Sequence, residues 1–230
     1  MYRLVVSCYR LFRVFFSGKL RRTSMKNTNQ SVLKWAQTAL LAALCYVAFT
    51  FLQIKIPMPG GDATSIHIGN AFCVLAALLL GGPCGGLAGA VGMTIGDLLD
   101  PVYVTVAPKT FVLKFCIGLI TGLVAHRVAH ISESNDKAYV MKWSVIASVC
   151  GLGFNVIFDP LVGYFYKMYI LGQPQEMASV LAKWSTAATF VNAVISTILV
   201  AVIYNVLRPA LKKSGLLVDI NTGHKNMAKA

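Results

Sequence analysis

The chain has 230 residues, of which 57% are hydrophobic and only 13% are charged, and its formal net charge is +13. A soluble domain usually carries about 25% charged residues, and apolar runs of roughly 18 residues or more are typical of membrane spans. The composition therefore excludes a soluble domain and indicates an integral membrane protein. Basic residues flank the apolar runs, where they face anionic lipid headgroups, and this placement argues against a nucleic-acid-binding protein.

The N-terminal segment, residues 1–24, is basic, and its arginines and lysines interrupt every apolar run. It therefore lacks the unbroken apolar core of a secretory signal. One interpretation is a basic helix on the membrane surface. The other, which we favour, is an upstream extension with Met25 as the working start. We divide the chain into a basic cytoplasmic segment (1–32), a membrane domain (33–208) and a basic cytoplasmic tail (209–230).

Six apolar segments predict an all-α polytopic fold with six transmembrane helices. They cover about residues 33–54, 66–80, 83–99, 108–128, 143–171 and 184–207. Pro160 predicts a kink in the fifth helix, because proline removes a backbone hydrogen bond. Most of the 21 lysines and arginines precede the first helix, lie between the fourth and fifth, or follow the sixth. The positive-inside rule then predicts a cell-membrane protein with both termini in the cytoplasm.

Two helices carry stripes of small residues. Ala36, Ala39 and Ala43 share one face of the first helix. Small residues at such spacing pack helices together, or they form a docking face for another membrane subunit, and the residues alone favour packing. The third helix has a glycine stripe, which predicts that a neighbouring backbone approaches closely. Its members are Gly85, Gly89, Gly92 and Gly96.

Polar residues gather at the far ends of segments 66–80 and 83–99. The turn Gly81-Gly82-Pro83 is so short that the two segments form a helical hairpin, so their far ends lie on the same side of the membrane. The polar residues at these ends are Asp62, His67, Asn70, Asp97, Asp100 and Lys109.

Further polar residues fall in the outer halves of the other predicted helices. They are Tyr46, Thr50, Gln53, Lys114, Asn155, Asp159 and Asn192. Charges inside a membrane are costly and usually face an interior site. A channel would show polar groups along its whole length, whereas the inner halves here consist mainly of Ala, Gly, Leu and Val. The asymmetry predicts a pocket that is open to the outside and closed below.

Structural interpretations of these residues remain open. Lys114 pairs with Asp97 or Asp159 in one of them, which satisfies a buried charge. Asn155 and Asn192 join helices by hydrogen bonds in another. The sequence does not separate these interpretations from ligand contact.

Three residues near the turns have simpler interpretations. His67 is an interfacial histidine without a role, Lys109 is a solvated lysine at a helix start, and Asp100 before Pro101 forms a turn.

With these features in view, the stretch IHIGNAF…GGPCGGLAGAVG…GDLLDPVYVTVAPKTFVLK resembles the substrate-binding S components of energy-coupling factor (ECF) transporters. The similarity is to the riboflavin-type branch, which includes members for pyridoxine and hydroxymethylpyrimidine. The resemblance implies six helices, a small water-soluble vitamin or precursor bound near the outer surface, and no ATPase activity or cofactor in the chain itself.

The resemblance also implies partners and site residues. Such proteins dock on a transmembrane coupling subunit through an AxxxA pattern in the first helix, and two cytoplasmic ATPases drive the cycle. Ala39-Leu-Leu-Ala-Ala43 matches that pattern, and Ala36 extends it, so the resemblance favours docking over packing. By location, the implied substrate-binding residues are His67, Asn70, Lys114, Asn155, Asp159 and Asn192.

Two other function classes are weaker. Asp97 and Asp159 suggest an intramembrane aspartyl enzyme, but Thr94 interrupts the GxGD pattern, and neither GxSxG nor HExxH occurs. A stand-alone ion-coupled secondary transporter would show an inverted repeat, and none is detectable. The six cysteines form no CxxC pair, which predicts no metal site and no disulfide. We therefore predict a non-enzymatic substrate-specificity subunit.

Overall fold

The computed structural model of the protein describes residues 27–218 and residue 220, so the predictions for residues 1–24 lie outside the described part. Within that part the chain forms six α-helices and one two-stranded sheet. The helices are α2 (Asn27–Phe51), α3 (Gly69–Leu80), α4 (Gly82–Leu99), α5 (Ala107–Gly122), α6 (Lys137–Phe165) and α7 (Gln175–Ser214). Short 3₁₀ turns cover Pro59–Gly61 (η1) and Val104–Val106 (η2), and π-helical turns extend α5 over Leu123–Val128 (η3) and α6 over Tyr166–Ile170 (η4).

The chain is 81% helical, and four helical segments are long and apolar enough to cross a membrane. They are Gln30–Phe51, Val104–Val128, Lys137–Ile170 and Gln175–Ser214. The number of helices agrees with the six predicted, but α3 has only 12 residues. At about 1.5 Å of rise per residue such a helix is too short to cross a bilayer core of roughly 30 Å.

The prediction of an all-α fold is wrong in one place. Strands β1 (Gln53–Pro57) and β2 (Ala63–His67) form an antiparallel hairpin between α2 and α3, with Gln53 opposite His67 and Pro57 opposite Ala63. The predicted helices 33–54 and 66–80 therefore each lose an end. The isoleucines in this stretch favour strands, and Gly60 and Gly61, with φ of 81° and 77°, make the tight turn.

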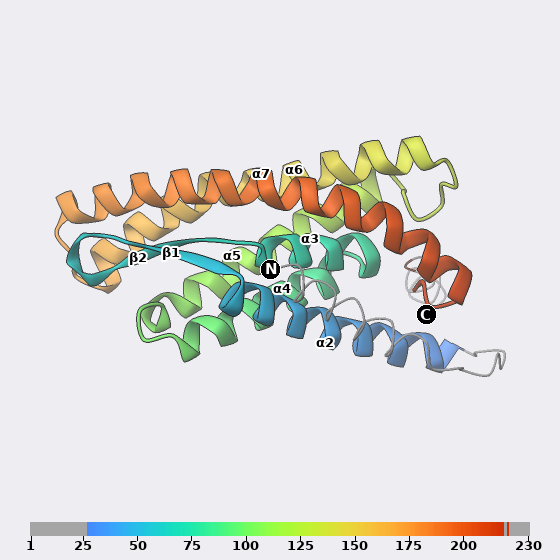
Figure 1. Ribbon diagram of the computed structural model, residues 1–230, viewed down its shortest axis with the longest axis horizontal. Helices are drawn as coiled ribbons and strands as arrows, with labels where there is room; N and C mark the ends of the chain where they lie inside the picture. The colour runs from blue at the N-terminus through green and yellow to red at the C-terminus, as the bar shows by residue number, and fades with distance from the viewer. Residues whose placement is uncertain (1–26, 219, 221–230) are drawn as a thin grey trace, which may run out of the picture.

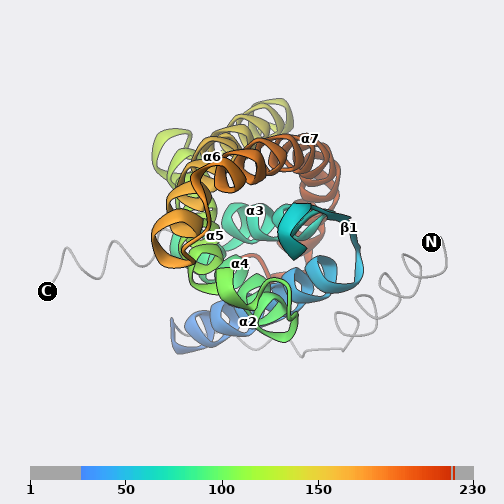
Figure 2. The same cartoon turned by 90° about the vertical axis from the view of Figure 1, so that its left-hand side faces the viewer.

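The helices surround α3. Figure 2, seen from one end, places α3 at the centre with α2, α4, α5, α6 and α7 around it, and all residues of α3 except Phe72 are buried. The long helices α6 and α7 lie side by side along one flank, and α2 lies along the opposite flank (Figure 1). A central helix that is apolar all round needs such a coat.

The glycine stripe of α4 brings helices into backbone contact, as predicted. A Cβ added to Gly85 would lie 2.2 Å from the Cα of Ala77 on α3, and one added to Gly92 would lie 2.2 Å from the carbonyl oxygen of Ala42 on α2. A second glycine pairing was not predicted. On the α5 side, a Cβ added to Gly118 would lie 2.4 Å from the Cα of Gly86. Three helices are thus locked on α4 at distances that only glycine allows.

The two ends of the helix bundle differ. The hairpin end carries β1, β2, the link 100–106 and the link 171–174. The opposite end carries the start of α2, the loop 129–136 and the last turns of α7 (Figure 1). We call it the basic end. Its cations are Lys34, Arg127, Lys137, Lys142, Arg208, Lys212 and Lys213.

Candidate functional site: a polar cavity under the hairpin

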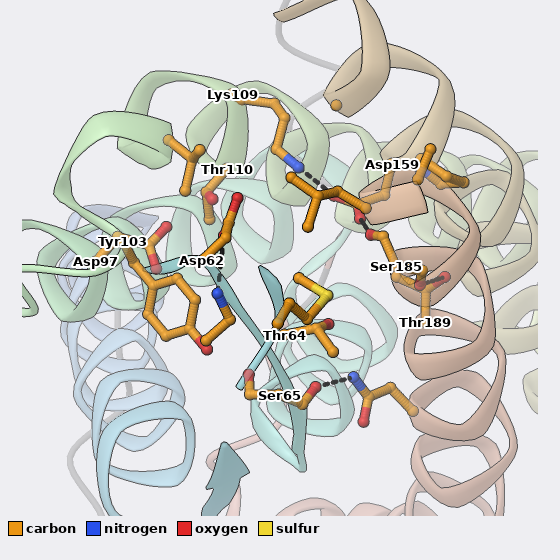
Figure 3. A pocket seen from close by; sticks show the side chains of 18 of the residues that line it. Asp62, Thr64, Ser65, Asp97, Tyr103, Lys109, Thr110, Asp159, Ser185 and Thr189 are labelled. Carbon is orange, nitrogen blue, oxygen red and sulfur yellow. Dashed lines mark hydrogen bonds and ion pairs between the residues drawn. The ribbon is translucent and has the colours of Figure 1, made fainter. Parts of the chain in front are cut away.

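A cavity of about 110 Å³ lies at the hairpin end, between the β-hairpin and α4, α5, α6 and α7. Figure 3 shows polar side chains from all of these elements pointing into it. The polar lining residues are Asp62, Thr64, Ser65, His67, Asp97, Tyr103, Lys109, Thr110, Lys114, Asp159, Lys167, Ser185, Thr189 and Asn192. Asp62, His67, Asp97 and Lys109 come from both predicted polar clusters, so the two clusters do lie together.

The hairpin is held over the cavity by Asn192 of α7. The Asn192 Nδ2 donates to the carbonyl oxygen of Ser65 at 2.9 Å, and its Oδ1 accepts from the backbone N–H of His67 at 2.9 Å. The amide side chain therefore bonds β2 much as a neighbouring strand would. Asn192 lines the cavity, but both ends of its amide already have partners in the hairpin.

Ion pairs tie the rim together. Lys109 Nζ lies 3.0 Å from Asp159 Oδ1, with side chains only 11% and 14% exposed, and Ser185 Oγ donates to Asp159 Oδ2 at 2.7 Å. The interpretation of Lys109 as a solvated lysine is therefore wrong. Lys167 pairs with Asp62 of the hairpin turn. These bonds join α5, α6, α7 and the hairpin around one space.

A further ion pair lies outside the cavity lining. Lys55 of β1 pairs with Asp100 of the link after α4, so Asp100 does more than form a turn. Lys55 is 42% exposed, and pairs of this kind contribute little stability because water screens them.

Two charged residues in the cavity lack an ionic partner. Asp97, at the end of α4, is 2% exposed, and its Oδ2 has no hydrogen-bond partner. Lys114 of α5 is 7% exposed, and no carboxylate oxygen of residues 27–218 lies within 4.0 Å of its Nζ. The proposed pairing of Lys114 with Asp97 or Asp159 is not formed, since Asp159 bonds Lys109 instead.

Aromatic rings form one wall. Phe49 meets His67 edge-on, with ring centroids 4.8 Å apart, and Tyr103 lies 6.4 Å from Phe49. Burial, helped by the charge of Lys114, lowers the pKa of His67 to about 3. The His67 ring is therefore neutral, and its Nδ1 accepts from the Gly69 N–H at 3.2 Å, which leaves the proton on Nε2. Burial also raises the pKa of Tyr103 to about 12, so its phenol stays protonated.

Two predicted substrate-binding residues lie elsewhere. Asn70 of α3 and Asn155 of α6 are each 1% exposed, and neither lines the cavity. Sequence reasoning placed them by depth along a helix, but which side they face depends on helix rotation. It also missed Tyr103, Ser185 and Lys167 as lining residues. Ser185 and Thr189, one turn apart on α7, were a signal that could have been used.

The alanine stripe of α2 faces outward. Ala36, Ala39 and Ala43 are exposed, whereas Ala42 meets Gly92 of α4 on the opposite face. The three alanines therefore do not pack against any described part of the chain, and the interpretation as internal packing does not hold. Trp35, 59% exposed, lies beside them.

Comparison with known proteins adds the family. A family model described as "ECF-type riboflavin transporter, S component" matches residues 29–209. The solved structure of ThiT from Listeria monocytogenes has a similar fold, with a TM-score of 0.58 and 17% sequence identity over 79% of this chain and 98% of that one. A comparison with curated proteins found no significant match. The resemblance inferred from residues 66–114 is thus confirmed: the chain is a membrane protein that belongs to the family of ECF-type riboflavin transporter S components.

Proposed function

We propose that this chain is the substrate-specificity subunit of an ATP-driven ECF transporter and that it binds a small water-soluble vitamin or precursor in the cavity under the hairpin. The observation that carries the proposal is the enclosed polar cavity itself, which is built from five separate elements at one end of the fold. A preformed cavity with a few convergent polar groups is what a small-molecule site requires.

The cavity opens to the outside of the cell in this proposal. Lysines and arginines concentrate at the basic end, and the positive-inside rule assigns such an end to the cytoplasm. Both termini are then cytoplasmic. At the hairpin end the described charges are mixed, since Lys55, Lys109 and Lys167 each pair with an aspartate.

Substrate binding would use the cavity as it stands. The Lys109–Asp159 and Lys167–Asp62 pairs hold α5, α6 and the hairpin in position, which reduces the ordering that a ligand must impose. The neutral His67 ring and the aromatic wall offer an edge donor and apolar surface. We propose no reaction on the substrate, in keeping with membership of a family of transporter subunits.

Energy would come from partner proteins. The exposed stripe Ala36, Ala39 and Ala43 presents small side chains along α2, and such a stripe lets a partner helix approach closely. We assign this stripe to docking on a transmembrane coupling subunit, which two cytoplasmic ATPases would drive. Lipid covers the remaining apolar surface.

The experiment that tests this function is Ala39→Trp, measured for substrate binding and for uptake with the ATPase module. We expect uptake to be lost while the dissociation constant changes less than about twofold, because the stripe lies on α2 away from the cavity. The matched control is Ile198→Trp, which adds a similar bulk to an exposed position on α7. Uptake that persists in Ala39→Trp, or uptake that needs no ATPase, would contradict the proposal and favour an ion-coupled transporter.

A further inference from the structure

The charges that line the cavity do not all pair with each other. Its lining contains three aspartates and three lysines. Asp159 pairs with Lys109, and Asp62 pairs with Lys167. Asp97 and Lys114 remain, and both are more than nine-tenths buried. The cavity thus holds one carboxyl and one amino group whose pairing requirements the described chain leaves unmet.

Such an arrangement is costly unless a ligand completes it. A buried polar group without a partner loses its hydration and gains nothing in return. Relief within the protein is restricted, because Asp97 and Lys114 lie on α4 and α5. The backbones of these helices are in contact where a Cβ added to Gly118 would lie 2.3 Å from the N of Gly86. The two groups are therefore held on a rigid scaffold, as a preorganised binding site needs.

The size and charge of the cavity limit what can fill it. Its volume of about 110 Å³ is well below the roughly 300–1,000 Å³ of pockets for drug-sized ligands. Since the lining aspartates and lysines balance, a ligand with a large net charge would leave one side chain unpaired. The aromatic wall of Phe49 and Tyr103 favours a flat ring.

We propose that the cavity selects a single-ring nitrogen heterocycle, neutral or zwitterionic, which presents a hydrogen-bond donor to the carboxyl of Asp97 and an acceptor to the amino group of Lys114. The inference rests on the proposed binding function and narrows its substrate class. It departs from the three-ring flavin that the family description suggests, because a fused tricycle exceeds the enclosed volume.

The test uses the full chain purified in detergent, with thermal unfolding and calorimetric titration against defined probes. The probes are an aminopyrimidine with a hydroxymethyl group, the same pyrimidine without its amino group, pyridoxine, and riboflavin. We expect the aminopyrimidine or pyridoxine to raise the melting temperature and riboflavin not to. Removal of the amino donor should weaken pyrimidine binding at least about tenfold, the value of one hydrogen bond to a charged group.

Variants of the two unpaired residues separate ligand contact from a structural role. Asp97→Asn and Lys114→Met should each weaken binding of the single-ring probe at least about tenfold, while the unliganded melting temperature is maintained, because each removes a buried charge that lacks a partner. Asp100→Asn is the matched control, since Asp100 pairs with Lys55 outside the cavity lining. Its affinity should change less than twofold.

The outcomes distinguish the inference from the function on which it rests. Tight binding of riboflavin with none of the single-ring probes would overturn the inference and leave the S-component function in place. Variants that melt earlier but bind unchanged would show that Asp97 and Lys114 are structural, and would also overturn it. If no probe binds, the inference fails, and ATPase-dependent uptake with the Ala39→Trp comparison then decides the function separately.

Discussion

The hairpin end and the basic end of this protein are joined by different chemistry. At the hairpin end, side chains bond to side chains, as Lys109 does to Asp159. At the basic end, side chains bond to backbone carbonyls. Arg208 donates to the carbonyl oxygens of Ile131 and Ser134 at 2.6 and 3.0 Å, and Gln37 donates to that of Leu216 at 2.8 Å.

This difference matters because the two kinds of bond respond differently to a ligand. A side-chain ion pair can rearrange when a new charged or polar group arrives. A backbone carbonyl is fixed by its helix or loop, so a bond to it fixes the position of the segment. The comparison teaches that binding and closure are separated along the molecule, and variants at each end should separate them in experiment.

The largest effect should come from the scaffold that both ends share. Gly118→Ala would place a Cβ 2.3 Å from the N of Gly86, so α4 and α5 must move apart. We expect a loss of at least about 3 kcal/mol in unfolding free energy, with binding lost as well, measured by thermal unfolding in detergent. The control is Gly153→Ala on α6, where an added Cβ meets nothing within 4 Å. Equal stability of both variants would show that the close helix contact is not limiting.

At the hairpin end, Asp159→Asn should cost about 2 kcal/mol, because it leaves the poorly exposed Lys109 without its ionic partner. Substrate affinity should fall with it. Asp100→Asn removes a pair whose lysine is 42% exposed, and it should cost no more than about 0.5 kcal/mol. Chemical or thermal unfolding of both variants makes the comparison. A larger loss in Asp100→Asn would contradict the importance of the cavity pair.

At the basic end, Arg208→Met should lower the unfolding free energy by about 1–2 kcal/mol through loss of its two carbonyl bonds. Substrate affinity should stay within about twofold of the original, because Arg208 lies far along α7 from the cavity. Lys213→Met, at an exposed position in the last turn, is the control. A strong loss of affinity in Arg208→Met would mean that the two ends are coupled.

The smallest effect concerns acid. In the folded protein the pKa of His67 is about 3, against 6.5 for an ordinary histidine, so the folded state cannot take up the proton that the unfolded chain binds. This contribution to stability is complete above pH 6.5 and is lost as the pH falls from 6.5 toward 3. Between about pH 7.5 and 5.5 the loss should be about 1 kcal/mol.

The measurement compares His67→Asn with the original chain over this range, so that other titrating groups cancel. The groups whose charges act on His67 are Lys114 and Asp159, and both remain in the variant. Parallel stability curves for the two proteins would show that His67 takes up a proton in the folded state.

The membrane character, the helix number and the family followed from local features of the sequence. Apolar runs mark helices wherever lipid is the solvent, and the glycines of α4 declare a close contact by their spacing alone. The hairpin was missed because Ile54 and Ile66 extend apolar runs that also fit a helix. Only the pairing of β1 with β2 across Gly60 and Gly61 decides for strands.

The candidate site divides in the same way. The sequence by itself determined that His67, Lys114, Asp159 and Asn192 lie at one level of the molecule, because depth along a helix depends only on residue number. Tertiary structure decided which of them turn toward the cavity and which charges pair, because helix rotation and packing are set by contacts far apart in the chain. Lys109 therefore takes the partner that sequence reasoning offered to Lys114, and Asp97 and Lys114 are left facing the cavity.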